Sequence, residues 1–123
     1  MTPGNRQVGA PGRAARSPEE ALLDLLGLAA RAGATLTGTD MVRRGIRDGE
    51  VAHVVLAADT SPTQQQKLIP LLDARKVPYG ILLSRERLGA ALGKGPVSAV
   101  GLTNRGLAGR AAELAAAISS PQD

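Results

Sequence analysis

The chain has 123 residues, 43% of them hydrophobic, and a formal net charge of +4 at pH 7. It contains no cysteine, which excludes disulfides, thiolate metal sites and cysteine nucleophiles, and one histidine cannot build a histidine metal site alone. Tyr79 is the only aromatic residue, which excludes a sheet that binds single strands by stacking bases on aromatic rings.

Residues 1–16 form the first predicted segment, a basic tail. They are rich in glycine, proline and arginine and hold few apolar side chains, so burial cannot offset the entropy of ordering and we expect disorder. Residues 1–18 carry three arginines and no acidic residue, whereas the rest of the chain is almost neutral. A basic tail suggests an acidic partner such as nucleic acid; the alternative is that it only keeps the protein soluble.

Helices and strands are predicted to alternate over residues 17–120, which we assign to one domain. The first helix begins with a capping box, Ser17 and Glu20, and ends at Gly33. The predicted strands cover residues 34–36, 51–57, 79–83 and 97–102. A second helix is predicted to begin near Thr39, and Ser61, Ser84 and Thr103 are predicted to cap the three helices after it. This alternation predicts an α/β fold, a three-layer α/β/α sandwich with helices on both faces of a sheet.

The motifs of common catalytic sites are missing from the sequence. His53 lies inside a predicted central strand, where we interpret it as packed core or sheet surface. The glycine-rich stretch 89–95 lacks the hydroxyl residue of a phosphate-binding loop and follows a helix instead of a strand. We therefore predict no enzyme, no cofactor and no metal. The sequence also predicts neither a secretory signal nor a membrane helix, and we expect a cytoplasmic protein.

Residues 37–47 are the most informative segment for function. They form a glycine turn that opens a helix, and the free backbone N–H groups of such a start can hold a phosphate. Arg43, Arg44 and Arg47 add positive charge to the same helix, and the first and last of these share a face. These residues alone support RNA contact and an ordinary solvated helix about equally.

Residues 38–49 resemble the signature of the kink-turn RNA-binding ribosomal protein superfamily, of the L-seven-Ae and L-thirty-e type, including its bacterial YlxQ-like branch. That pattern is Gly-Thr-Asn-Glu, two variable residues, Lys-Ala-Val and a glycine at the helix end, and its glycine spacing matches without a gap. Three further stretches are similar to family motifs in the same order. They are the strand with its acidic turn, 54–59, the Val-Pro lead into a strand, 77–79, and the Leu-Gly-x-Ala-x-Gly helix, 88–93.

The resemblance implies a mixed four-stranded sheet and an RNA-binding protein that acts in translation. Its partner would be ribosomal RNA or another structured RNA with a kink-turn-like internal loop, and the ribosome would be a further partner. The implied RNA-binding residues are Gly38, Thr39, Asp40, Met41, Arg43 and Arg44 at the helix start, and Lys94, Gly95, Pro96 and Val97 before the last strand. In this reading the glycine turn enters the groove at tandem sheared G·A pairs, Arg44 takes the position of a phosphate-binding lysine, and the loop 93–98 covers an extruded nucleotide.

Two positions depart from the family pattern. Asp40 replaces an asparagine, so it can accept from guanine N1 and N2 but cannot donate to guanine O6. Met41 replaces a glutamate and removes an acceptor for the donors of guanine. We therefore expect weaker binding to ordinary kink turns, or recognition of a different internal loop.

Two alternative functions remain open on the sequence. One is a protein-interaction module that uses the same surface without RNA. The other is a detached RNA-recognition domain of an RNA-modifying system, because some RNA ribose methyltransferases carry this fold at their N-terminus. We also expect a monomer that does not bind membranes, since the apolar stripes are used up inside the predicted sandwich.

Overall fold

Helices and strands alternate strictly along residues 16–119, the part of the chain that the computed structural model describes. The helices are α2 (Pro18–Arg31), α3 (Thr39–Arg47), α4 (Pro62–Arg75), α5 (Arg85–Ala91) and α6 (Arg105–Ser119), and the strands are β2 (Thr35–Thr37), β3 (His53–Leu56), β4 (Tyr79–Ile81) and β5 (Ala99–Leu102). The predicted order is confirmed, with boundaries that differ by one or two residues. The predicted basic tail lies outside the described residues, apart from Arg16.

The four strands form one mixed sheet in the order β2-β5-β3-β4. Strand β5 runs antiparallel to both of its neighbours, whereas β3 and β4 are parallel. As a result, β2, β3 and β4 all end at the edge of the sheet where β5 begins. The loops that follow these three strands therefore meet the loop that precedes β5.

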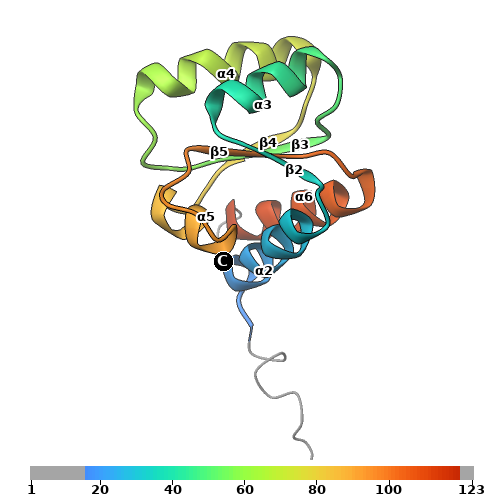
Figure 1. Cartoon of the computed structure of the whole chain (residues 1–123), viewed down its shortest axis with the longest axis vertical. Helices are drawn as coiled ribbons and strands as arrows, with labels where there is room; N and C mark the ends of the chain where they lie inside the picture. Colours follow the sequence, from blue (N-terminus) through green and yellow to red (C-terminus); the bar gives the residue numbers. More distant parts are fainter. Residues whose placement is uncertain (1–15, 120–123) are drawn as a thin grey trace, which may run out of the picture.

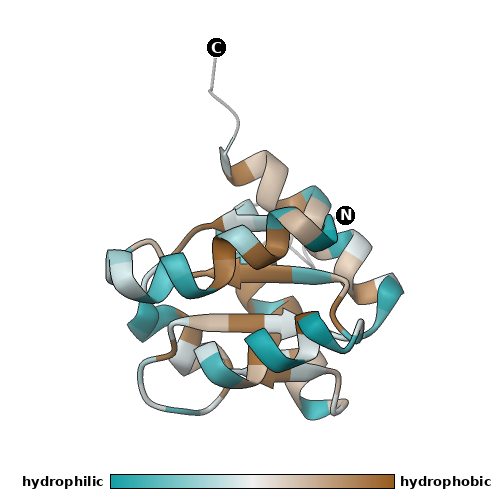
Figure 2. Ribbon diagram, turned by 90° about the horizontal axis from the view of Figure 1, so that it is seen from above, coloured by the Kyte–Doolittle hydropathy of each residue, from teal (hydrophilic) through white to brown (hydrophobic). Residues whose placement is uncertain are grey.

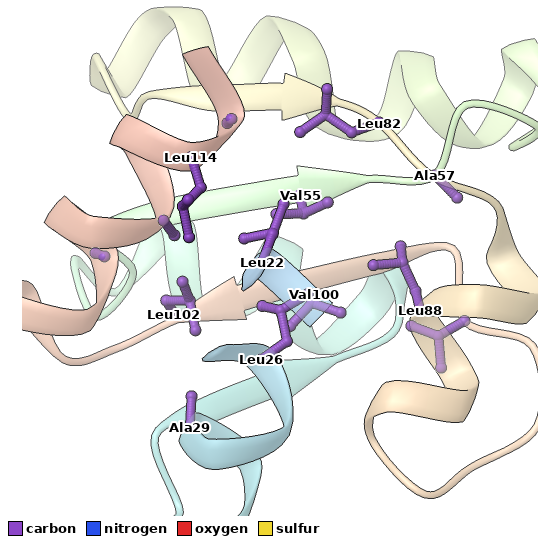
Figure 3. Close-up of a cluster of buried hydrophobic side chains, with 14 residues drawn as sticks. Leu22, Leu26, Ala29, Val55, Ala57, Leu82, Leu88, Val100, Leu102 and Leu114 are labelled. Atoms are coloured by element: carbon purple, nitrogen blue, oxygen red, sulfur yellow. The ribbon is translucent and has the colours of Figure 1, made fainter. Parts of the chain in front are cut away.

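The sheet lies between two layers of helices, as predicted (Figure 1). Helices α3 and α4 cover one face, and α2, α5 and α6 cover the other. All residues of the central strands β3 and β5 are buried, and Figure 2 shows hydrophobic residues along the strands, with hydrophilic residues on the helices and loops. Figure 3 shows the core on the α2, α5 and α6 side, where Leu22, Leu26, Val55, Val100 and Leu102 meet.

Side chains cap most of the helix starts where the sequence predicts. Ser17 and Glu20 form the predicted capping box, and Ser61 and Ser84 accept from backbone N–H groups of α4 and α5. The predicted cap of the last helix is wrong. Helix α6 begins at Arg105, and the side chain that accepts from its first turn is Asn104, one residue after Thr103. Both residue types are good caps, so the sequence could not decide between neighbours.

His53 is part of the core, as interpreted from the sequence, with 2% of its surface exposed. Neither ring nitrogen has a hydrogen-bond partner among the described residues. Burial lowers the pKa of the imidazole below its ordinary value of 6.5, because desolvation disfavours the charged form. Within residues 16–119, no helix is long and apolar enough to cross a membrane.

Candidate nucleic-acid interface

The start of α3 is fixed at the end of the sheet by a glycine. Gly38 has φ 95° and ψ 155°, a backbone conformation that side chains strongly disfavour. Its N–H donates to the carbonyl of Ala99 at 2.8 Å, and its carbonyl accepts from Val42 N at 2.9 Å. The turn before α3 is therefore bonded to β5 on one side and to its own helix on the other.

Helix α3 differs from its neighbours in how it begins. In α2, α4, α5 and α6 a Ser or Asn side chain accepts from an N–H of the first turn. Of the helices in residues 16–119, α3 alone lacks such a bond. Because the first N–H groups of a helix have no acceptor within it, those of Thr39, Asp40 and Met41 are available to a ligand.

A pocket of about 590 Å³ opens in front of this helix start, and we call it the Gly38 pocket. Its lining comes from the β2–α3 turn, α4, α5 and the loop before β5: Thr37, Gly38, Thr39, Asp40, Met41, Ser61, Gln64, Lys67, Arg85 and Ser98. Lys67 and Arg85 are the cations of this pocket and Asp40 is its carboxylate, and Arg85 is also paired with Asp59 at 3.7 Å. Met41 is 45% exposed and offers a flexible apolar surface beside these polar groups.

A second pocket, which we call the Lys94 pocket, adjoins the first through Arg85, which lines both. Its other lining residues are Asp59, Glu86, Ala90, Lys94, Gly95 and Pro96. Backbone bonds hold Arg85 in place. Its N–H donates to Asp59 Oδ1 at 2.8 Å, and its carbonyl accepts from Val97 N at 3.0 Å. The loops after β3 and before β5 are thus tied to the start of α5.

Residues 93–98, which we call the Lys94 loop, lie directly on α5 because residue 89 of this helix is glycine. A Cβ at this position would stand 1.9 Å from the carbonyl oxygen of Gly95, and the Gly89 carbonyl accepts from Lys94 N at 2.8 Å. A side chain at position 89 would therefore collide with the backbone of Gly95, which cannot turn aside as a flexible side chain could. This contact gives a physical reason for the glycine in the helix motif at residues 88–93.

The structure brings most of the predicted RNA-binding residues to one end of the sheet. Gly38, Thr39, Asp40 and Met41 line the Gly38 pocket, and Lys94, Gly95 and Pro96 line the adjoining one. The other three predicted residues lie elsewhere.

Arg43 and Arg44 are exposed on α3 but line neither pocket. The side chain of Val97 is 6% exposed and packs in the core, so it does not lie on this surface. Val97 lies two residues before β5, and its side chain joins the same buried cluster as Val100 and Leu102.

Sequence reasoning missed four residues of the Gly38 pocket: Ser61, Gln64, Lys67 and Arg85. Ser61 was recognised only as a helix cap, and the other three carried no motif. These residues could have been predicted from the rule that loops after parallel strands meet at one end of a sheet. The rule can be applied only when the order of the strands is known, and the sequence pattern does not determine that order.

The ion pairs of the described residues all lie outside α3 and α4. They join Arg16 to Asp24, Arg85 to Asp59, Arg87 to Glu19, and Arg110 to Glu113. Within residues 16–119 the basic side chains of α3 and α4 therefore form no ion pair with a carboxylate. No cluster of three or more His, Asp or Glu side chains in this region could hold a metal ion.

Residues 20–111 match the family model described as the ribosomal protein L7Ae/L30e/S12e/Gadd45 family. The chain is 36% identical over 86 residues to the RNA-binding protein YlxQ of Bacillus subtilis, a match that covers 70% of this chain and 86% of YlxQ. It is 33% identical over 89 residues to the large ribosomal subunit protein eL8 of Picrophilus torridus, which covers 72% of this chain and 70% of eL8.

Two solved structures have a similar fold. A Bacillus halodurans protein of unknown function superimposes with a TM-score of 0.74 and 33% identity, over 76% of this chain and 94% of that one. The Giardia lamblia 15.5kD RNA binding protein shares the fold with a TM-score of 0.68 at 24% identity, over 80% of this chain and 84% of that one. The family model covers most of the chain, and both sequence relatives are more than 30% identical to it: the chain belongs to the ribosomal protein L7Ae/L30e/S12e/Gadd45 family.

Proposed function

We propose that this protein binds structured RNA through the Gly38 and Lys94 pockets, which lie at the end of the sheet where β2, β3 and β4 end. The observation that carries the proposal is the start of α3, whose first-turn N–H groups have no side-chain cap and face a pocket that contains Lys67 and Arg85. Free N–H groups beside cations suit a phosphate or the edge of a base. The names of two similar proteins, an RNA-binding protein and a ribosomal protein, support the same partner class.

The Gly38 pocket contacts both the RNA backbone and a base, and the Lys94 loop contacts a further nucleotide. The free N–H groups of α3 and the flexible ammonium of Lys67 hold phosphate oxygens, which set register without reading sequence. Asp40 accepts from guanine N1 and N2, and the exposed Met41 side chain packs on the face of a neighbouring base. The Lys94 loop covers a nucleotide that leaves the stack. This division describes recognition of an internal loop related to a kink turn.

The arginines of α3 add a sequence-independent contribution. Arg44 is exposed and has no carboxylate partner in the described part of the chain, so its charge is available to phosphate. Replacing it removes one charge-assisted contact. We expect Arg44→Ala to weaken RNA binding by about 1–2 kcal/mol and to reduce the salt slope by about one contact.

Asp40 tests the base-reading part of the proposal. Asp40→Asn restores an amide donor toward guanine O6 and removes a negative charge that repels phosphates. We expect this variant to bind a standard kink-turn RNA more tightly than the wild type does.

The experiment is a calorimetric titration of the wild type, Arg44→Ala and Asp40→Asn with a kink-turn RNA at two salt concentrations. Arg110→Ala is the matched control, because it removes an arginine that is paired with Glu113 on the other layer. If Asp40→Asn gains nothing and Arg44→Ala behaves like Arg110→Ala, this surface is not the RNA site. A function as a protein-interaction module would then be favoured.

A further inference from the structure

A large hollow lies at the opposite end of the sheet from the Gly38 pocket. Its volume is about 1,020 Å³, and we call it the Arg105 pocket. It forms where residues 49–52 lead into β3, residues 75–78 lead into β4, and residues 103–105 follow β5. The Gly38 pocket instead lies where β2, β3 and β4 end, so α3 separates the two hollows.

The charge of the Arg105 pocket is positive. Arg75, Lys76 and Arg105 line it, against a single carboxylate from Glu50. None of the three cations belongs to an ion pair of the described residues. An exposed group of cations without carboxylate partners attracts an anionic ligand more strongly than a mixed surface does.

The three cations differ in how firmly they are held. Arg75 Nη1 donates to the carbonyl of Arg47 at 2.9 Å, which satisfies a free carbonyl at the end of α3 and orients the guanidinium. Lys76 and Arg105 make no side-chain hydrogen bond that would hold them in the described structure. Lys76 follows α4 with φ 58°, in the left-handed region. These two residues are free to follow a flexible polyanion.

Helix α3 connects the two hollows with exposed arginines. Met41, in its first turn, lines the Gly38 pocket, and Ile46, in its last turn, lines the Arg105 pocket. Nine helical residues span about 13 Å at 1.5 Å each. Arg43, Arg44 and Arg47 are exposed along this length, so cations run from one hollow to the other without a gap longer than one helical turn.

We propose that the Arg105 pocket is a second phosphate-binding site, which holds the backbone of the same RNA beyond the stretch bound at the Gly38 pocket. The proposal rests on the proposed function, because it needs an RNA already placed along α3. Duplex nucleic acid carries a phosphate about every 3.4 Å along each strand, so a strand that follows α3 passes several phosphates before it reaches Lys76 and Arg105. The contacts are charge contacts with the backbone and are independent of base sequence.

The test compares two RNAs and two double variants. One RNA carries a kink-turn-like internal loop with minimal stems, and the other has one stem longer by about ten base pairs. Lys76→Asn/Arg105→Gln neutralises the pocket, and asparagine suits the left-handed backbone at position 76. Arg31→Gln/Arg110→Gln is the control, because it removes the same charge from the α2 and α6 layer, away from this pocket.

The expected result is selective for length. The pocket variant binds the long RNA roughly tenfold more weakly than the control does, with a salt slope smaller by roughly one to two, and binds the short RNA like the control. The single variant Arg105→Gln, which leaves Lys76 unchanged, gives a smaller loss of the same kind if the double variant unfolds. Amide chemical shifts of Gly49 and Gly109, which line the pocket, change with the long RNA and not with the short one.

Several results would overturn the proposal, and they separate it from the proposed function. Equal binding of the long RNA by the pocket variant and the control shows that the pocket does not contact RNA. An equal loss for both RNAs shows only a general charge effect. If Arg44→Ala still weakens binding in these cases, the RNA site at the Gly38 pocket stands without the second site. If neither RNA binds the wild type, both proposals fail.

Discussion

The two helical layers of this protein treat their polar groups in opposite ways. On the α2, α5 and α6 side, every helix start is capped by a side chain, and the ion pairs of the described residues lie here or at the start of α5. On the α3 and α4 side, α3 begins without a side-chain cap, and no basic side chain of the two helices has a carboxylate partner within residues 16–119. The first layer satisfies most of its polar groups, although Arg31 and Arg105 belong to no ion pair of the described residues, whereas the second layer leaves donors and charge for a ligand.

This difference separates the residues that hold the fold from those that bind. Capped helix ends and close backbone contacts stabilise the protein without any partner. Uncapped N–H groups and unpaired cations add little stability to the free protein, but they are ready to contact phosphate. Changes in the first layer should therefore lower stability, and changes on α3 should lower affinity.

The largest effect on stability is expected at Gly89, in the layer formed by α2, α5 and α6. Gly89→Ala forces a Cβ against the carbonyl of Gly95 at 1.9 Å, so the Lys94 loop must move. We expect a loss of about 2–4 kcal/mol in the free energy of unfolding, measured in urea, together with weaker RNA binding.

Gly109→Ala is the matched control for this change. Gly109 also lies in a helix, but a Cβ there meets no atom within 4 Å. Since alanine favours the helix over glycine, we expect a gain of about 0.5–1 kcal/mol. A similar loss in both variants would mean that the Gly89 contact is not what holds the loop.

The next effect concerns the buried His53, whose two ring nitrogens lack partners in the described structure. Burial lowers its pKa below 6.5, so the unfolded chain takes up the proton first. The folded protein should therefore lose stability as the pH falls below about 6.5 toward the lowered pKa.

His53→Leu removes both the unsatisfied nitrogens and the titration. We expect the free energy of unfolding to rise by about 1–2 kcal/mol at pH 7. We also expect it to depend less on pH below about 6.5 than it does in the wild type. Urea unfolding at several pH values measures both. An unchanged pH dependence in the variant would show that another group causes it.

A smaller effect is expected from the capping box of α2. Ser17→Ala removes the acceptor for Glu20 N, a bond of 3.1 Å, and should cost about 1 kcal/mol of stability. Thr39→Ala, at the first residue of the uncapped α3, removes no capping bond and should change stability little. Thermal unfolding of both variants measures the difference, and equal losses would contradict the contrast between the two layers.

Much of the fold could be predicted from the sequence, because local chemistry decides it. The capping box at Ser17, the apolar run of β3 and the glycine before α3 each fix an element on their own. The site was predicted only in part. Lys67 and Arg85 reach the Gly38 pocket because parallel strands end at one edge of the sheet, and strand order depends on packing between distant segments.

The placement of Val97 shows a second limit of the sequence. It stands beside loop residues that line the Lys94 pocket, yet its side chain is buried in the core. A resemblance transfers positions, whereas the direction of a side chain depends on where the strand begins. A change of direction between neighbouring residues is a property of the backbone that a motif does not encode.

The smallest effect on stability gives the sharpest test of the two layers. One arginine should affect stability and not RNA affinity, and another should affect RNA affinity and not stability. Arg87 donates to Glu19 Oε1 at 2.7 Å, joining α5 to α2, whereas Arg44 has no carboxylate partner in the described residues. Exposed ion pairs contribute little, so Arg87→Ala should cost about 0.2–1 kcal/mol of stability and leave RNA affinity unchanged. Arg44→Ala should leave the melting temperature unchanged and weaken RNA binding. Thermal unfolding and RNA titration of both variants complete the comparison. If Arg87→Ala weakens binding as much as Arg44→Ala does, the RNA surface extends to the contact between α5 and α2, and the division between a layer that stabilises the fold and a layer that binds is wrong.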